Sequence, residues 1–338
     1  MTMKVSGMEP ADHRNPAAAD ASVDPDLTEV APSPHVTEAG RTTRRMMLDV
    51  LVALAPVAGA AVYFFRWSAV RQMAICLAAC LISEALCALM RRRRPTLGDG
   101  SAAVTAIILA LSLPTTAPWY APVTGSVAAI GIGKALFGGL GMNLFNPAMV
   151  GRAFVMISFA GALGAAGYQD PGSSIDIMTQ ATPLTAFQQS GLAAGLDDLL
   201  IGRTNGSPGE TSALACLIGG LFLCLRRSAA WRIPAAMLAA AGIIALLDAG
   251  IGPAGWTVGH HLFSGAMLFG AFFIATDPVS SPLTPPGQII YGAGIGALVM
   301  VIRVFSGYPE GVMFAVLLMN ALTPLINRWT IPTPFGGQ

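Results

Sequence analysis

The sequence contains few charged residues. Of its 338 residues only 11% are charged, the formal net charge is +1, and 54% are hydrophobic. This composition excludes a soluble domain with a polar surface and indicates an integral membrane protein. The net charge near zero, with arginines clustered in the sequence, also argues against a nucleic-acid binder.

The sequence also lacks the residue spacings of metal and redox-cluster sites. It has no Cys-x-x-Cys pair and no glycine-rich dinucleotide loop. The five cysteines all lie in apolar runs, where we expect small hydrophobic core residues: Cys76, Cys80, Cys87, Cys216 and Cys224. We therefore expect no metal site, no catalytic residue, no iron–sulfur cluster and no dinucleotide site on this chain.

Residues 1–40 are rich in Ala, Pro, Asp and Glu and have almost no aliphatic periodicity. Such a segment cannot bury enough apolar area to offset its ordering entropy, so we predict a disordered tail. We expect no signal peptide, because the apolar sequence starts only after Arg44 and Arg45 and continues as a full span.

From Met46 onward the chain divides into apolar segments, most of about 20 residues, the length that crosses a bilayer. The predicted spans are 46–65, 70–90, 101–114, 121–138, 147–166, 210–226, 231–250, 257–275, 287–305 and 309–327. The third and fourth are short and interrupted by glycine and proline, so we expect broken or tilted helices in the protein interior. The predicted fold is an all-α membrane protein with about ten transmembrane helices.

The arginine clusters predict the orientation, because basic flanks stay on the cytoplasmic side. With both termini cytoplasmic, the clusters at 41–45, 91–94 and 226–232 and Arg328 all fall inside. The predicted regions are a cytoplasmic tail (1–40), a first transmembrane repeat (41–166), an extracytoplasmic loop (167–209), a second repeat (210–330) and a cytoplasmic C-terminal tail (331–338). We thus expect a multi-pass protein of the bacterial inner membrane, with loop 167–209 in the periplasm.

Ser101–Met156 reads as a weak copy of Ser264–Leu318, offset by about 163 residues. The matched anchors are Leu113-Pro114 with Asp277-Pro278, Gly131-Ile132-Gly133 with Gly294-Ile295-Gly296, and Asn146-Pro147 with Tyr308-Pro309. The matched spans are five apart, so the two five-helix repeats must be inverted, an arrangement that usually builds a site between the copies. The alternative is a chance match between apolar sequences punctuated by Gly and Pro.

Ionisable residues within spans are costly and suggest function by default. Our candidates for an ion pathway are Asp277, Arg303 and Arg152. Alternatively, Asp277 caps a proline-rich turn, and the two arginines hold half-helix carbonyls or lipid phosphate. We give Lys134 and Asp248 no catalytic role.

The loop between the two repeats contains a distinct polar run, Asp176-Ile-Met-Thr179-Gln-Ala181-Thr182-Pro-Leu-Thr185. Thr182 followed by proline is typical of a helix N-cap with Pro at the first helical position. A phosphate esterified to this hydroxyl would lie at the positive end of the new helix, so a cofactor anchor is compatible with the cap.

The pattern Asp-x-x-Thr-x-Ala-Thr-Pro-Leu resembles the flavinylation site of the family of RnfD and NqrB membrane subunits. The resemblance extends over nearly all of residues 41–335, through Asn146–Arg152, Phe273–Ser280 and Gly287–Pro324. It implies covalent FMN, attached to Thr182 through a phosphoester by a separate flavin transferase, with Asp176, Thr179 and Ala181 completing the motif. The chain departs from the family pattern at Gln180, where Gly is usual.

The family's role implies one membrane subunit of an ion-translocating electron-transport complex, with other membrane and peripheral subunits as partners. The short chain favours RnfD, hence electron transfer between ferredoxin or flavodoxin and NAD(H) coupled to Na⁺ or H⁺ movement. A second, noncovalent flavin such as riboflavin is compatible with this resemblance. Three alternatives stay open: the NqrB subunit of the Na⁺-translocating NADH:quinone reductase, a flavin-free solute transporter or channel, and a structural brace for other subunits.

Overall fold

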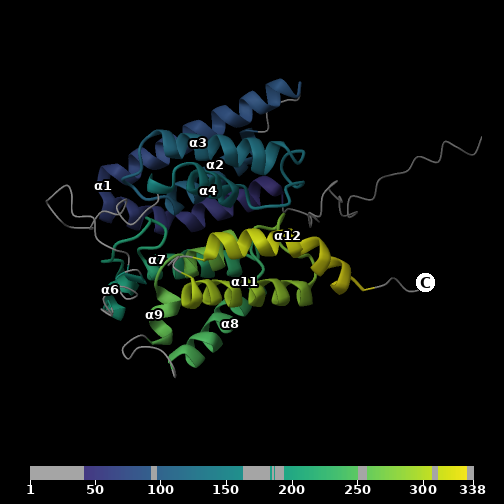
Figure 1. Ribbon diagram of the computed structural model, residues 1–338. Helices are drawn as coiled ribbons and strands as arrows, with labels where there is room; N and C mark the ends of the chain where they lie inside the picture. Colours follow the sequence, from purple (N-terminus) through teal and green to yellow (C-terminus); the bar gives the residue numbers. More distant parts are fainter. Residues whose placement is uncertain are drawn as a thin grey trace, which may run out of the picture.

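The computed structural model describes residues 42–92, 97–162, 183–184, 186, 194–249, 257–306 and 311–332. Within these ranges the chain forms helices and no strand (Figure 1). The helices are α1 (Thr43–Met90), α2 (Ser101–Ser112), α3 (Tyr120–Ala128), α4 (Pro147–Ser158), α6 (Leu196–Ile201), α7 (Ala213–Leu225), α8 (Arg232–Ala249), α9 (Val258–Phe263), α10 (Met267–Phe269), α11 (Pro285–Phe305) and α12 (Val312–Thr330). The predicted all-α class is confirmed.

Each of the ten predicted spans contains helix. The helices α1, α11 and α12 are long and apolar enough to cross a membrane, and α2, α4 and α7 are shorter apolar helices. The first two predicted spans form the single element α1, which is broken at Arg66, where φ is 51° and ψ is −129°. Figure 1 shows the chain reversing within α1, so this reversal needs no separate connecting loop.

The structure also contains the short or interrupted helices that were predicted from glycine and proline. α2 has only 12 residues and ends at Ser112, directly before Leu113-Pro114. Two helices continue as π-helical turns, α3 as η2 (Ala129–Ala135) and α10 as η5 (Gly270–Ile274). Such wider turns inside helices are frequent at functional sites.

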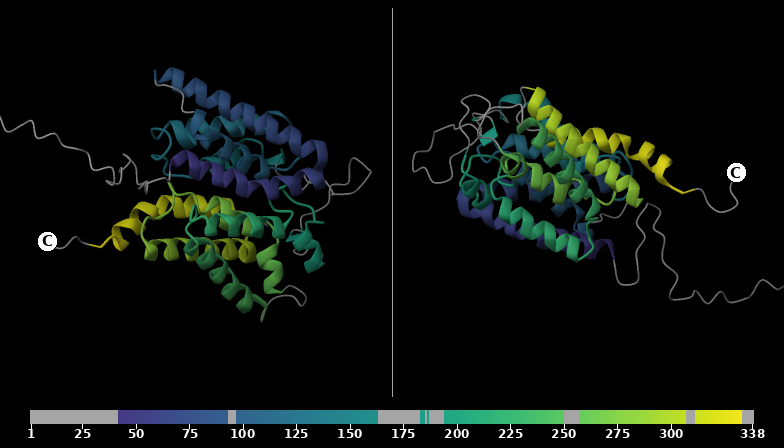
Figure 2. Two further views of the ribbon diagram at one scale, coloured as in Figure 1. Left: turned by 180° about the vertical axis from the view of Figure 1, so that it is seen from behind. Right: turned by 90° about the horizontal axis from the view of Figure 1, so that it is seen from below.

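The two halves of the chain form two neighbouring layers. α1 to α4 lie above α7 to α12 in Figure 1, and the view from behind in Figure 2 separates the same layers. The repeat offset relates α2 to α10 and η5, α3 and η2 to α11, and α4 to α12. The layers contact each other through α1 against α7 and α4 against α12.

Glycines allow the helices to approach closely. A Cβ on Gly296 of α11 would overlap the carbonyl oxygen of Met237 on α8, and one on Gly292 would overlap that of Ile233. In the first half, a Cβ on Gly133 would lie 2.8 Å from Cα of Pro147. Backbone contact through small residues is a usual means of helix association in membranes.

Candidate functional site

The predicted flavinylation motif lies outside the described residues, which omit Asp176, Thr179, Ala181 and Thr182. The chain is described again directly after it. Pro183, Leu184 and Ala186 have helical backbone, and Leu184 is only 5% exposed. Helical backbone and the buried side chain of Leu184 are therefore found directly after the predicted motif.

The end of the same loop is tied to α9. The ring Nε2 of His260 lies 3.0 Å from the carbonyl oxygen of Ala194, and the ring Nδ1 lies 3.1 Å from the backbone nitrogen of Thr257. Because the Thr257 N–H can only donate, we assign the tautomer that carries its proton on Nε2. His260 thus fixes the segment that leads into α6, a role that the sequence did not suggest.

Between α6 and α7 a segment without regular helix is buried in the bundle. Asn205, Ser207, Glu210, Thr211 and Ser212 are each at most 9% exposed. Such backbone is tolerated at membrane depth only inside protein or beside a water-filled cavity. It is held partly by its own backbone, because the N–H of Gly209 donates to the carbonyl of Leu111 at the end of α2 over 2.8 Å.

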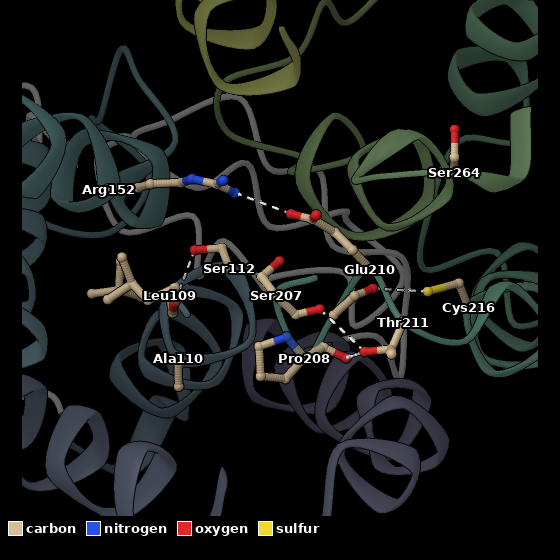
Figure 3. A network of polar contacts seen from close by, with 12 residues as sticks. Leu109, Ala110, Ser112, Arg152, Ser207, Pro208, Glu210, Thr211, Cys216 and Ser264 are labelled. Atoms are coloured by element: carbon tan, nitrogen blue, oxygen red, sulfur yellow. Dashed lines mark hydrogen bonds and ion pairs between the residues drawn. The ribbon is translucent and has the colours of Figure 1, made fainter. Parts of the chain in front are cut away.

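Glu210 of this segment forms an ion pair with Arg152 of α4 (Figure 3). Arg152 Nη1 lies 3.6 Å from Glu210 Oε1, and the side chains are 11% and 3% exposed. This separation is longer than the 2.7–2.9 Å of a strong charge-assisted hydrogen bond. The pair joins the predicted candidate Arg152 to a carboxylate that the sequence analysis missed.

Arg303 has a different environment. It is 4% exposed, and its two terminal nitrogens donate to the carbonyls of His261 and Ser264 over 2.6 and 3.0 Å. These carbonyls lie at the end of α9, where arginine commonly satisfies the last carbonyls of a helix. The contacts match the predicted alternative in which Arg303 holds half-helix carbonyls.

Asp277 lies in the turn after η5. Its carboxylate accepts from the backbone N–H of Val279 over 3.2 Å and from the Ser280 hydroxyl over 3.0 Å. These are the contacts of an Asx turn, so Asp277 has the capping role that was one of its two predicted readings. It also lines a small cavity of about 60 Å³ between the two halves, together with Asn143 and Lys134.

A second buried ion pair lies at the arginine-rich end of the bundle. Lys134 Nζ in η2 lies 2.5 Å from Glu84 Oε1 in α1 and 2.6 Å from the Ser101 hydroxyl at the start of α2. Ser101 in turn donates to Asp99 over 2.6 Å. Glu84 and Glu210 are the two carboxylic acids below 9% exposure in the part of the chain described.

The two halves meet at a neutral network around the Asn146-Pro147 motif. Asn146 is the N-cap of α4, and its amide nitrogen donates to the carbonyl of Ile274 in η5 over 3.3 Å. Asn320 of α12 lies 2.5 Å from the Tyr291 hydroxyl of α11. With its amide turned to satisfy this network, Asn320 accepts from the Asn146 N–H over 2.9 Å.

This arrangement of broken helices around the predicted motifs can be compared with known proteins. A model of the NQR2, RnfD, RnfE family matches residues 29–336. The chain belongs to this family. The predicted resemblance to RnfD and NqrB is therefore confirmed.

Several family members are similar over nearly their whole length. The D subunit of the "Na(+)-translocating ferredoxin:NAD(+) oxidoreductase complex" of Acetobacterium woodii is 42% identical, covering 91% of this chain and 95% of that protein. The D subunit of the "Ion-translocating oxidoreductase complex" of Halorhodospira halophila is 38% identical (92% and 96%). The D subunit of the "Proton-translocating ferredoxin:NAD(+) oxidoreductase complex" of Clostridium ljungdahlii is 37% identical (94% and 99%).

In this protein, the three charged residues predicted as ion-pathway candidates make different contacts. Arg152 pairs with Glu210, Arg303 binds carbonyls at the end of α9, and Asp277 caps a turn. No group of three or more His, Cys, Asp or Glu residues that could hold a metal ion occurs among the described residues. The chemistry of the described residues is that of a scaffold with buried, paired charges.

Proposed function

We propose that this chain is the RnfD-type membrane component of an ion-translocating ferredoxin:NAD⁺ oxidoreductase complex and that it carries FMN on Thr182. The observation that carries the proposal is the flavinylation motif, joined to family membership over almost the whole chain. The names of the relatives from A. woodii and C. ljungdahlii, both of them D subunits of such complexes, support this choice over the NqrB component of the quinone reductase.

The residues next to Thr182 fit a covalently attached flavin phosphate. Pro183 and Leu184 have helical backbone, and the Thr-Pro pattern predicts a helix start here, where free N–H groups would favour a phosphate. The burial of Leu184 and the hydrogen bond from His260 to Ala194 would hold the two sides of the loop against the bundle. When bound, the flavin ring supplies the electron-transfer chemistry, while Thr182 serves only as its tether.

The proposed setting is the bacterial inner membrane, with both termini cytoplasmic and loop 167–209 periplasmic. The arginine clusters support this orientation. Maturation would require a flavin transferase, and the ferredoxin and NAD(H) sites would belong to partner subunits. A second, noncovalent flavin such as riboflavin stays a prediction.

We further propose that the ion pathway runs along the boundary between the halves. Arg152 with Glu210 lies on it at one end and Asp277 lines its small cavity, whereas Arg303 acts by fixing α9. The relatives' names differ in the ion, Na⁺ in A. woodii and protons in C. ljungdahlii, so the proposal covers a monovalent cation of either kind.

The decisive experiment compares Thr182→Val with Thr182→Ser and Thr185→Val in cells that contain a flavin transferase. On a denaturing gel under ultraviolet light, we expect a fluorescent band for the wild type and for Thr185→Val and none for Thr182→Val. Thr182→Ser keeps a hydroxyl and should keep some fluorescence. A dark wild-type band would overturn the flavoprotein proposal in favour of a flavin-free transporter or channel.

The same variant tests the structural-brace alternative. If FMN on Thr182 carries electrons, the assembled Thr182→Val complex loses ferredoxin:NAD⁺ turnover while all subunits remain present. Full turnover in this variant would mean that the chain only braces its partners.

A further inference from the structure

A half-open pocket of about 220 Å³ lies at the arginine-rich end of the first half. The last turns of α1 form one wall with Glu84 and Arg91, and η2 forms the other with Ile130 and Lys134. Gly138 and Gly139 follow η2 at the rim and have positive φ values of 125° and 114°. Lys134 also lines the small cavity beside Asp277, so this pocket adjoins that cavity, and its lining includes no residue of the proposed flavin loop.

The pocket combines a buried ammonium with an exposed guanidinium. Lys134 is 4% exposed, and two of its three N–H groups are used by Glu84 and Ser101. The exposed Arg91 side chain makes no hydrogen bond or ion pair with any residue in the described part of the chain. Because Glu84 neutralises Lys134, Arg91 leaves this pocket with a net positive charge.

The position of the pocket indicates where its ligand comes from. Arg91 is the first of four consecutive arginines at the end of a membrane-spanning helix, which is typical of the bilayer surface. At the same helix end, Leu89 and Met90 directly before Arg91 are 74% and 83% exposed and could contact acyl chains. Basic pockets between transmembrane helices at this surface bind anionic lipid head groups.

We propose that this pocket binds a phosphate group, with Arg91 as its main ligand and Lys134 contributing at the base. A phosphate diester presents oxygens that accept charge-assisted hydrogen bonds from both side chains. The group can come from an anionic phospholipid or from a free phosphate compound, and the two sources differ in whether acyl chains are needed.

The test uses the purified assembled complex and fluorescent phosphatidylglycerol in non-ionic detergent. We expect saturable binding that weakens about tenfold in Arg91→Gln, the loss of one charge-assisted contact. Arg91→Lys should retain part of it. The matched control is Arg328→Gln, which removes one exposed arginine from the end of α12 and should leave binding unchanged.

Inorganic phosphate then separates the two sources. Displacement of the labelled lipid by millimolar phosphate identifies the phosphate group alone as the ligand, and Arg91-dependent lipid binding without displacement identifies the lipid. Equal binding by the wild type, Arg91→Gln and Arg328→Gln overturns the proposal, as does equal binding of phosphatidylcholine. The presence of all subunits in the purified complex checks that each variant assembles.

Discussion

The two halves of the chain share their close-packing glycines but bury different polar groups. Gly133 and Gly296 occupy matching repeat positions, and each lies against the backbone of a neighbouring helix. The first half buries the charges of Glu84, Lys134 and Arg152, whereas the second buries Glu210 and Arg303 together with neutral groups such as Tyr291 and Asn320. The repeat thus preserves the backbone contacts of the scaffold, while the buried ion pair between Glu84 and Lys134 lies entirely within the first copy.

The largest effect should come from breaking the charge pair of the first half. Lys134→Met leaves the Glu84 carboxylate buried without its cation, which we expect to destabilise the fold by about 3–5 kcal/mol. Denaturant unfolding of the purified chain in detergent measures this loss. The double variant Lys134→Met with Glu84→Leu should recover part of it, and equal stability of the single and double variants would contradict the buried-pair account.

The shared glycines give a test with a control inside the same motif. Gly296→Ala places a methyl group against the Met237 carbonyl and should cost about 1–3 kcal/mol through overpacking. Gly133→Ala, its repeat partner, should also destabilise. Gly131 has nothing within 4 Å of an added Cβ, so Gly131→Ala should be neutral or stabilising by about 0.4–1 kcal/mol. Thermal unfolding of the three variants would refute the repeat comparison if their order were reversed.

The neutral network of the second half should be less sensitive. Tyr291→Phe removes the hydroxyl that lies 2.5 Å from Asn320 but keeps the buried ring. The expected loss is about 0.5–1.5 kcal/mol, the net contribution of one hydrogen bond. A loss as large as that of Lys134→Met would show that the second half depends on buried polar contacts as strongly as the first.

The smallest stability change is expected for Asp277→Asn, in which an amide oxygen can still accept from the Val279 N–H. We expect a change of less than about 1 kcal/mol, within the range of surface substitutions and caps. If the charge of Asp277 serves the ion pathway, ion uptake into vesicles per electron transferred falls while stability is kept. Unchanged ion uptake would leave Asp277 with the capping role alone.

The sequence predicts the helices well because the length of an apolar run is a local property. It also predicts α2 as short and places Asn146-Pro147 at a helix start, since proline and cap residues act over a few positions. It could not predict that Lys134 meets Glu84, 50 residues earlier, because only tertiary packing brings them together. Glu210 was not among the predicted site residues, because the apolar run that follows it made Glu210 resemble the end of a membrane span.

The candidate site is divided in the same way. The motif around Thr182 can be recognised from the sequence alone, because the order of its residues defines it. The partners of Arg152 and Arg303 cannot be predicted from the sequence, since a buried arginine can bind carboxylates, carbonyls or lipid phosphates. Only the packing of α4 against the Glu210 segment, and of α11 against α9, distinguishes these cases.

The break at Arg66 affects how the topology can be mapped in cells. The first two membrane crossings meet at one backbone position, so there is no spacer there to receive an epitope tag or a protease site. A tag inserted here would push apart the two helices that meet at Arg66. Its signal would then reflect damage to the fold and not the topology. Single cysteines at Tyr63 or Trp67, which are 78% and 75% exposed on either side of the break, offer labelling positions that leave the chain length intact.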